Sequence, residues 1–582
     1  MSLQFCTNLD KNKLLIRKAI RQKVNDKLKE INSVEPKKKN NEFTEIKSDG
    51  GKSEETYSDE NSPADFNKAI EASGLGLYNV ILLFLAIVGQ FASIFESSTM
   101  SYILPIAECD LQLTLNDKGV LNAVGYAGMM ISAIFWGYLA DTRGRRNILL
   151  YGYLADAACV FGSALSQNFI MLITFKFLGG LIVNGPAAVL FTYLVEMHGP
   201  KHSGIIIMIV GMITSTAMLA LPLFAWAIFP QDWQFRLFDS LQINTWQIYL
   251  FVCGLPSLLS GLILFILPES PRFLMGQGRN EEALKSFRTI YYFNTRKPKD
   301  TYPIKSLIQE LPDRKSNKDE AIFTVEPNTE AKHAKPKSRS FLEGLQQMKP
   351  LFHKPLLLMS LRCYTMQLCI FLGMNTIRLW LPQLFASTAE YEALHFGEDD
   401  VSSTMCTILE YSVNKTAETL TNHENICSEP INISIDMYMN NIIVSATGFF
   451  GYFFAGGIVR VLGAKRLLTY GLFLSGLLGF TLYFSVNSLM TLVVSSLFQT
   501  VTVVSVSSLM SAVVTLFPTQ LRSVVVAACM MCGRLGALTG NLLFPIFVQI
   551  GCMPPFLMVS AALILAGALS IFVPNPSKVT SS

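Results

Sequence analysis

Apolar residues fall in long blocks along this chain, and polar residues gather between the blocks. Twelve blocks are long enough to cross a membrane as helices, because about 18 mostly apolar residues span the hydrocarbon core. Lipid offers no hydrogen-bond partners, so a spanning block must pair its backbone groups internally, as a helix does. The predicted spans are residues 77–103, 119–139, 148–165, 169–194, 205–228, 246–267, 356–385, 437–461, 467–484, 489–517, 524–550 and 554–573.

Polar segments divide the chain around these spans. Residues 1–73 are charged and rich in Ser, and we expect a disordered cytoplasmic tail, because so little apolar surface cannot offset the entropy of ordering. Within this tail, residues 17–31 fit either a solvated segment or a short basic helix on anionic lipid. The remaining segments are a six-helix half (74–268), a polar central loop (269–354), a second six-helix half (355–574) with a luminal loop (386–436), and a short tail (575–582).

Loop charge predicts the orientation in the membrane. An even number of spans places both termini on one side. The loop at 386–436 is acidic and holds one lysine, Lys415, whereas basic residues gather on the side of the central loop: Arg143, Arg145, Arg146, Arg460, Lys465, Arg466 and Arg522. Because basic loops stay in the cytoplasm, the termini and the central loop are predicted to be cytoplasmic. A vesicle membrane and the plasma membrane both remain open.

A charged turn of ten residues, Gly137-Tyr-Leu-Ala-Asp141-Thr-Arg-Gly144-Arg145-Arg146, lies between the second and third spans; we call it the decad. Gly137 is predicted to let two helices approach closely, and Gly144 to permit a bend that few other residues tolerate. Asp141 could accept from free N–H groups at a helix start or pair with an arginine. An ordinary basic loop that happens to hold two glycines is the alternative.

The two halves repeat one another. Gly456-x-x-x-Arg460-x-x-Gly463 is a degraded copy of the decad and begins 319 residues after it. Pro518, after the tenth span, follows Pro200, after the fourth, by 318 residues. The two sequence offsets are nearly equal, which indicates an internal duplication of the chain. The alternative is that short basic loops resemble each other by chance. Two six-helix pseudo-repeats facing each other across a midplane cavity are the predicted architecture.

Composition excludes several classes of function. Charged residues make up only 15% of the 582 residues and hydrophobic residues 51%, whereas a soluble domain carries about 25% charged residues. A net charge of +4 gives no reason to expect nucleic acid as a partner. No nucleophile, base or metal constellation stands out, so neither an enzyme nor a cofactor is expected. The Cys529-x-x-Cys532 pair lies in an apolar span and is interpreted as two small core residues.

Four charged residues stand out within the predicted spans: Glu96, Lys176, Arg378 and Arg534. A charge in hydrocarbon costs at least about 2.5–3.5 kcal/mol, so such residues usually face a cavity or a partner. Glu96 could bind a proton or a cationic group, and the two arginines could hold a carboxylate or phosphate. The alternatives are contact of Glu96 with water, snorkelling to the cytoplasmic interface or pairing for Lys176, snorkelling to the outer interface for Arg378, and a purely structural Arg534.

Several of these motifs resemble known families. The decad resembles the loop signature of the major facilitator superfamily. Residues 268–274, with Pro268-Glu269-Ser270-Pro271-Arg272, are similar to a signature of its sugar-porter-like members. Residues 225–230, 245–251 and 103–110 resemble the synaptic vesicle glycoprotein 2 group. The resemblance covers about residues 77–282 and 356–574, and it implies a twelve-helix facilitator fold with a luminal loop between the seventh and eighth helices.

The resemblance also implies a cytoplasmic gate. A Glu at the end of the fourth span, here Glu196, is expected to latch the decad, with Lys201 or His202 replacing the missing arginine of the pattern. Glu269 and Arg272 are expected to make charge-assisted bonds to neighbouring helix ends.

The ligand pocket of the group is matched only in part. Trp226 matches a tryptophan of the group's pocket, and Glu96 matches one member of an acidic pair. The residues at the other aligned pocket positions differ from those of the group: Ser93, Met374, Asn375, Val506 and Met510. The resemblance therefore leaves the ligand open. Trp226 remains a pocket candidate.

The loop at 386–436 carries signals of an extracytoplasmic environment. Asn414-Lys-Thr416 and Asn432-Ile-Ser434 are glycosylation sequons. Cys406 and Cys427 are a candidate disulfide in an oxidising compartment, with free thiols as the alternative.

Two functions follow from the sequence. The first is a gradient-driven transporter of a small organic solute by alternating access, embedded in lipid, since no nucleotide-binding loop is present. The second is a non-transporting membrane protein like the synaptic vesicle glycoproteins, acting as a vesicle regulator or receptor through unknown partners of its cytoplasmic tail.

Overall fold

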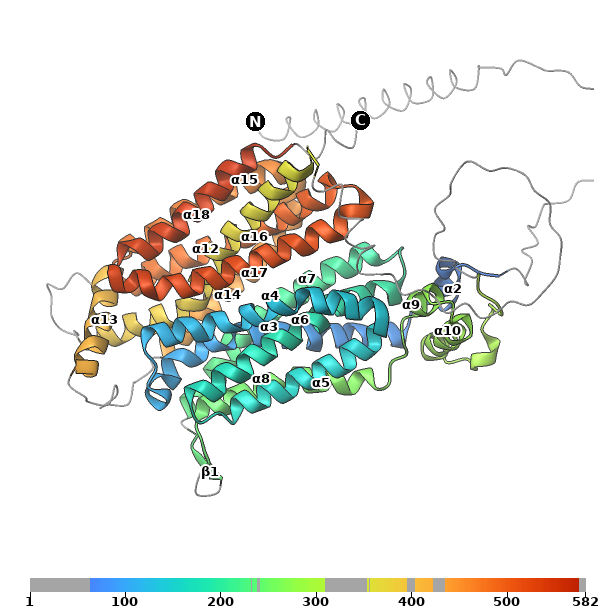
Figure 1. The fold of residues 1–582 in the computed structure, drawn as a ribbon, viewed down its shortest axis with the longest axis horizontal. Helices are drawn as coiled ribbons and strands as arrows, with labels where there is room; N and C mark the ends of the chain where they lie inside the picture. The colour runs from blue at the N-terminus through green and yellow to red at the C-terminus, as the bar shows by residue number, and fades with distance from the viewer. Residues whose placement is uncertain are drawn as a thin grey trace, which may run out of the picture. The chain divides into compact units, whose positions relative to one another are not determined.

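The computed structural model describes residues 63–231, 233–237, 241–308, 353–354, 356–394, 404–421 and 435–574. These residues contain twelve long helices (Figure 1). The first half comprises α3 (Leu77–Leu111), α4 (Leu115–Arg143), α5 (Arg145–Ala164), α6 (Phe169–His198), α7 (Ser203–Ile228) and α8 (Thr245–Leu264). The second half comprises α12 (Leu356–Leu394), α14 (Ile435–Leu462), α15 (Ala464–Thr481), α16 (Ser488–Leu516), α17 (Thr519–Ile550) and α18 (Met553–Ile571). The predicted twelve-helix fold is confirmed.

Short elements occupy the two ends of the bundle. Helices α2 (Phe66–Ala72), α9 (Pro271–Gly276) and α10 (Asn280–Thr295) lie together at one end, which also holds the decad and which we call the basic face (Figure 1). The antiparallel hairpin of β1 (Phe235–Leu237) and β2 (Leu241–Ile243) joins α7 to α8 at the other end, the hairpin face. Helix α13 (Met405–Thr421) lies between α12 and α14 at this same face. Three-residue 3-10 turns complete the description: η1 (Phe229–Gln231), η2 (Lys299–Thr301) and η4 (Leu482–Phe484).

Several of the helices are longer than the hydrocarbon core requires. Helix α3 has 35 residues and α17 has 32, so at about 1.5 Å per residue both outreach a core about 30 Å thick. Among the described residues, nine helices are long and apolar enough to cross a membrane, by length and composition. The other three long helices, α4, α5 and α14, pack against these nine.

The duplication is visible in how equivalent helices begin. The Asn168 side chain caps α6 by accepting from Met171 N at 2.8 Å, and Asn487 caps α16 by accepting from Met490 N at 2.8 Å. Asn487 follows Asn168 by 319 residues, the offset that separates the two copies of the decad. An asparagine at this position satisfies one of the N–H groups left free at a helix start. The two halves therefore repeat in local chemistry as well as in helix number.

Buried apolar clusters show where the halves meet. One cluster lies within the first half and extends to α2, α9 and α10, and a second lies almost wholly within the second half. A third joins both halves near the hairpin face, where Met100 and Ile103 share a core with Leu381, Phe385 and Tyr438. A smaller cluster around Tyr126 and Leu379 also spans the two halves. The shared apolar cores thus lie away from the basic face.

Helices α4 and α6 approach so closely that a methyl group does not fit between them. A Cβ added at Gly180 would overlap the carbonyl of Gly125, whereas a Cβ added at Gly125 would meet nothing within 4 Å. We expect Gly180→Ala to destabilise the protein by about 1–3 kcal/mol through overpacking. The melting temperature of the purified protein measures this, with Gly125→Ala as the matched control. Equal melting temperatures for the two variants would contradict the close approach.

Two segments predicted to be polar tail or loop contain folded structure. Residues 63–73 were predicted to belong to a disordered tail, but they form α2, in which Phe66, Ala69 and Ile70 are buried. Phe66 packs on Phe287 of α10, a residue of the predicted central loop. The prediction was wrong here because these apolar contacts come from a segment more than 200 residues away, which no local pattern shows. Residues 1–62, 309–352 and 575–582 lie outside the described residues.

Candidate functional site

A cavity lies between the two halves, and five helices line it. Its polar lining consists mainly of hydroxyl and amide groups, and Arg378 is its one cationic or anionic side chain among the described residues. The lining is Ser98, Ser101 and Tyr102 of α3, Ser215, Met218 and Leu221 of α7, Ile377, Arg378, Leu379 and Leu381 of α12, Asn441, Val444, Ser445, Gly448 and Phe449 of α14, and Ser495, Gln499 and Val503 of α16. The cavity therefore lies between the two six-helix halves, as the sequence predicted.

Arg378 ties the second half to the first. Its Nη1 donates to Ser98 Oγ at 3.0 Å, and its Nη2 donates to Tyr126 OH at 3.2 Å and to Asn375 Oδ1 at 2.7 Å. All three acceptors are neutral, and Arg378 forms no ion pair with a carboxylate in the described part of the chain. Its Nε is buried without a hydrogen-bond partner. Arg378 therefore lies at the cavity wall, not at an outer interface, and no carboxylate of the described residues pairs with its positive charge.

Arg534 supplies a second cation close to the same tyrosine. It lies on α17 and interacts electrostatically with Tyr126 of α4. No described carboxylate forms an ion pair with it. Arg534 does not line the cavity. The two arginines predicted as candidates are thus related through Tyr126, although only Arg378 reaches the cavity.

Glu96 and Lys176 form a buried ion pair within the first half. Lys176 Nζ of α6 lies 2.9 Å from Glu96 Oε2 of α3, and the two side chains are only 2% and 1% exposed. Lys176 also donates to Thr99 Oγ1 at 3.3 Å. Glu96 Oε1 has no hydrogen-bond partner and lies against Gly179. The pair is therefore not in contact with water, and Lys176 does not snorkel to the cytoplasmic interface.

A third buried charge, Asp156, was missed by the sequence reasoning. It lies on α5, is fully buried, and accepts a hydrogen bond from Ser257 Oγ through Oδ2, while Oδ1 has no partner. Glu96 and Lys176 both interact electrostatically with it. Its position within the span predicted at 148–165 was a usable signal, because an acid in a span is a candidate for a functional group.

Trp226 does not belong to the site. Its side chain is 44% exposed, and it does not line the cavity. The cavity-facing residues of α7 are Ser215, Met218 and Leu221, which share one face of the helix. At 100° per residue, position 226 is rotated by roughly 140° from position 221, so Trp226 faces away. The prediction of Trp226 as a pocket residue was therefore wrong.

The decad forms a tight turn that is held by the carboxylate of Glu269. Gly144 has φ +92° and separates α4 from α5. Glu269 Oε1 accepts from the backbone N–H groups of Arg145 and Arg146, each at 2.9 Å. A carboxylate at a helix N-terminus satisfies free donors and complements the helix dipole. Glu269 therefore makes the charge-assisted bonds to a helix end that the sequence predicted.

The arginines of the decad fasten neighbouring helix ends. Arg146 Nε and Nη2 donate to the carbonyls of Leu264 and Phe265, at 3.0 and 3.1 Å, and so cap the end of α8. Arg145 Nη1 donates to Ala140 O at 2.9 Å, and its Nε lies 3.6 Å from Glu196 Oε2. Glu196 is thus paired by the decad itself, not by Lys201 or His202.

Two further expectations at the basic face need correction. Arg272 was expected to bond to a helix end, but its guanidinium lies over the ring of Phe66, 5.6 Å from the centroid. Gly137 was expected at a close helix contact, yet a Cβ there would meet nothing within 4 Å. The side chain of Asp141 lies outside the described residues. The spacing of the motif could not show which of its two glycines is sterically required.

The two glycines of the decad make a matched test. A Cβ at Gly144 would overlap the carboxylate of Glu269, and an L-residue at positive φ costs roughly 1–3 kcal/mol. We expect Gly144→Ala to lower the melting temperature of the purified protein and Gly137→Ala to leave it nearly unchanged. A loss of stability in Gly137→Ala equal to that in Gly144→Ala would contradict this account.

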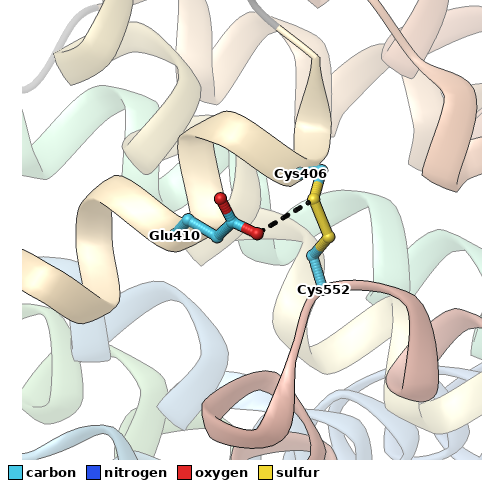
Figure 2. Close-up of side chains that lie close together, drawn as sticks. All are labelled: Cys406, Glu410 and Cys552. Atoms are coloured by element: carbon cyan, nitrogen blue, oxygen red, sulfur yellow. Dashed lines mark hydrogen bonds between the residues drawn. A yellow bond between two sulfur atoms is a disulfide. The ribbon is translucent and has the colours of Figure 1, made fainter.

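A disulfide at the hairpin face joins Cys406 of α13 to Cys552, which precedes α18 (Figure 2). Their Cα atoms are 5.2 Å apart, which is ordinary for a disulfide. The predicted partner of Cys406 was Cys427, so that pairing was wrong; Cys427 itself lies outside the described residues. Cys109, at the end of α3, is also disulfide-bonded.

Glu410 lies beside this disulfide, with Oε1 3.5 Å from Cys406 Sγ (Figure 2). The three residues have the proximity of a metal site. Both sulfurs are consumed by the disulfide, however, and thiolates are the form in which cysteine binds metals. The sequons belong to the same region: Asn414 is exposed on α13, and Asn432 lies outside the described residues.

The chain matches known proteins in sequence. Synaptic vesicle glycoprotein 2C of Mus musculus is 30% identical over 251 residues, which are 42% of this chain and 34% of that protein. Synaptic vesicle glycoprotein 2A of Homo sapiens is 29% identical over 238 residues, which are 40% of this chain and 31% of that protein. The matched segments thus span about a third of the length of these relatives.

The fold and the family are established by two further matches. The partially occluded inward open xylose transporter XylE from E. coli superposes with a TM-score of 0.57 at 15% identity, covering 85% of this chain and 98% of that one. The D-xylose-proton symporter gives a TM-score of 0.56 with similar coverage. The family model described as Major Facilitator Superfamily matches residues 86–409, more than half of the chain. This integral multi-pass membrane protein, which is not an enzyme, belongs to the major facilitator superfamily.

Proposed function

We propose that this protein moves a small organic solute across the membrane by alternating access, driven by a proton gradient. The observations that carry the proposal are the buried group of Glu96, Lys176 and Asp156 within the first half and the polar cavity between the halves. The cavity holds the solute, and the buried group holds the proton. The solute-binding residue Arg378 contacts Ser98, which follows Glu96 by two residues on α3.

Charge balance gives the reason for placing a proton at this group. Two carboxylates and one ammonium would carry a net negative charge if all three were ionised. A buried net charge costs several kcal/mol, and uptake of one proton removes it. The unpartnered Oε1 of Glu96 and Oδ1 of Asp156 are the oxygens at which that proton is held. Proton binding and release at these oxygens is the proposed coupling step.

Alternating access requires the halves to separate at one face as they close at the other. The shared core at the hairpin face, with Met100, Leu381 and Tyr438, closes the cavity on that side. The structural relatives are an inward open xylose transporter and a D-xylose-proton symporter, and the inward open state and the proton coupling are carried over here as part of the proposal. Opening toward the hairpin face then requires this core and the bonds of Arg378 to Ser98 and Tyr126 to break.

Uptake by purified full-length protein in proteoliposomes tests the proposal. We expect organic solutes from a mixed panel to accumulate when the lumen and the bath differ in pH, and not when a proton carrier has collapsed the difference. Protein-free liposomes provide the background. Accumulation that is indifferent to the pH gradient would refute proton coupling, and the absence of any solute movement would refute transport.

The orientation forms part of the same proposal. We place the basic face in the cytoplasm and the hairpin face outside it, because disulfides persist in oxidising compartments. Cys406, Cys552 and Cys109 are disulfide-bonded, and all lie at the hairpin face. In cells, a protease should reach a tag at residue 1 only after the membrane is permeabilised, while Asn414 carries glycan. Cleavage in intact cells of this tag and of a tag in the central loop would reverse the assignment.

A non-transporting role is the second candidate, and the similarity to synaptic vesicle glycoproteins 2C and 2A favours it. Under this alternative, the protein acts as a vesicle regulator or receptor through its N-terminal segment. Deleting residues 1–62 separates the two functions. Transport should survive the deletion under the first proposal, whereas recruitment of cytoplasmic partners should be lost under the second.

A further inference from the structure

We infer that the transported solute is an organic anion with one acidic group, and that Arg378 binds this group in the cavity. This inference rests on the proposed transport function and narrows its substrate class. It starts from the charges of the lining: one guanidinium faces the cavity, and no described carboxylate lies in its wall. A cation without a counter-ion in a protein interior raises the local positive potential and favours an anion.

The hydrogen bonding of Arg378 leaves room for a ligand. A guanidinium carries five N–H donors, and three contacts to neutral oxygens account for only part of them. The buried Nε–H has no partner. Arginine presents its donors as a planar fork that matches the two oxygens of a carboxylate. An incoming acidic group therefore gains a charge-assisted bond without first displacing a protein carboxylate.

The nearest acid along α3 does not neutralise Arg378. Glu96 is already paired with Lys176 at 2.9 Å.

The other residues of the cavity wall indicate the polarity of the non-acidic part of the solute. Ser445, Asn441 and Gln499 offer neutral hydrogen bonds, whereas Leu221, Val444 and Val503 offer apolar contact. One cation and a mixed neutral wall fit an amphipathic monoanion better than a polyanion, whose second charge would find no partner in the lining. The same wall gives no counter-ion to an organic cation, which would face Arg378 directly.

Binding at Arg378 also gives a physical link to the conformational change. Its bonds to Ser98 and Tyr126 cross from the second half to the first. An acidic group that takes over these donors replaces two bonds between the halves with bonds to the solute. The solute thereby weakens the tie that holds the halves together. Transport of the anion with a proton moves no net charge.

The test uses matched probes and purified full-length protein. Benzoate and hexanoate are compared with benzamide and hexanamide, and with benzylamine and hexylamine, by the shift in melting temperature and by uptake into proteoliposomes. We expect the carboxylates alone to stabilise the wild type. Arg378→Gln should weaken carboxylate binding about 10- to 100-fold, as expected for loss of a charged hydrogen-bond donor.

Two further variants separate a binding role from a structural one. Arg378→Lys keeps the charge without the fork and should lie between the wild type and Arg378→Gln. Arg362→Gln removes a cation of α12 that donates to Phe572 O, away from the cavity, and should bind carboxylates like the wild type. Unchanged carboxylate affinity in Arg378→Gln would overturn the inference, and so would preferential stabilisation by the amides or amines.

Uptake distinguishes failure of the inference from failure of the proposed function. Transport of the amines or amides in preference to the carboxylates would leave the transport proposal standing and overturn the anion assignment. Arg378-dependent binding of the carboxylates without any transport would support the anion site and overturn the transport proposal. A complete lack of binding and uptake across all three probe classes would overturn both.

Discussion

Replacing Glu96 with Gln is expected to abolish accumulation of solute against its gradient while leaving solute exchange intact. One pH unit is worth about 1.4 kcal/mol, so coupling to one proton supports about a tenfold concentration ratio. A glutamine still accepts from Lys176 Nζ, which lies 2.9 Å from the present carboxylate. It cannot bind and release a proton, so uptake in Glu96→Gln should stop at equal concentrations. Exchange of external for internal solute requires no net proton movement and should continue.

The control for this experiment is another acid of α3. Glu108 pairs with Lys118 of α4 at 2.5 Å near the hairpin face, and its side chain is 18% exposed. Glu108→Gln removes a carboxylate from the same helix and the same kind of pair, but not from the buried group, so accumulation should persist. Wild-type accumulation in Glu96→Gln would contradict the assignment of Glu96. If solute accumulation were then lost only in Asp156→Asn, the proton-binding group would be reassigned to Asp156.

The long spans and the turn of the decad could be predicted because their causes are local. A run of apolar residues can satisfy its backbone in lipid only as a helix, and the twelve helices lie within a few residues of the predicted ends except where they extend beyond the hydrocarbon. Gly144 was identified as a bend because few other residues adopt positive φ. Glu96, Lys176, Arg378 and Arg534 were recognised because charges in the spans are costly in hydrocarbon, although Asp156 was missed.

The failed predictions concern contacts between residues that are distant in sequence, and residues whose orientation on their helix the sequence does not reveal. Cys406 pairs with Cys552, 146 residues away, whereas Cys427 was chosen because it shares a loop. Trp226 was placed in the pocket by the family resemblance. The sequence could not correct this, because the rotation of α7 about its axis cannot be read from a helix that is apolar all round. The pairing of Glu96 with Lys176 brings α3 and α6 together. Each of these facts depends on how the helices pack against one another. This packing cannot be read from the local residue pattern of a single sequence.

Lys176→Met should be the most destabilising single change in the buried group. It removes the cation that pairs with Glu96 and leaves that buried carboxylate without a positive partner. Removing one partner of a buried ion pair costs about 3–5 kcal/mol, because the remaining charge is left in a low-dielectric interior. The melting temperature of purified Lys176→Met protein should therefore fall well below that of the wild type.

The double variant Glu96→Met with Lys176→Met makes the argument specific. Replacing both partners of a buried pair by apolar residues of similar volume is often neutral or stabilising. The double variant should therefore recover most of the stability lost in Lys176→Met, while Asp156 keeps its bond from Ser257. Independent sites would instead give additive losses. Additive melting-temperature losses would show that Glu96 and Lys176 are not energetically coupled, and the proposed proton site would lose its physical basis. Recovery of stability without recovery of solute accumulation is the expected pair of results, because the apolar pair packs but cannot bind a proton.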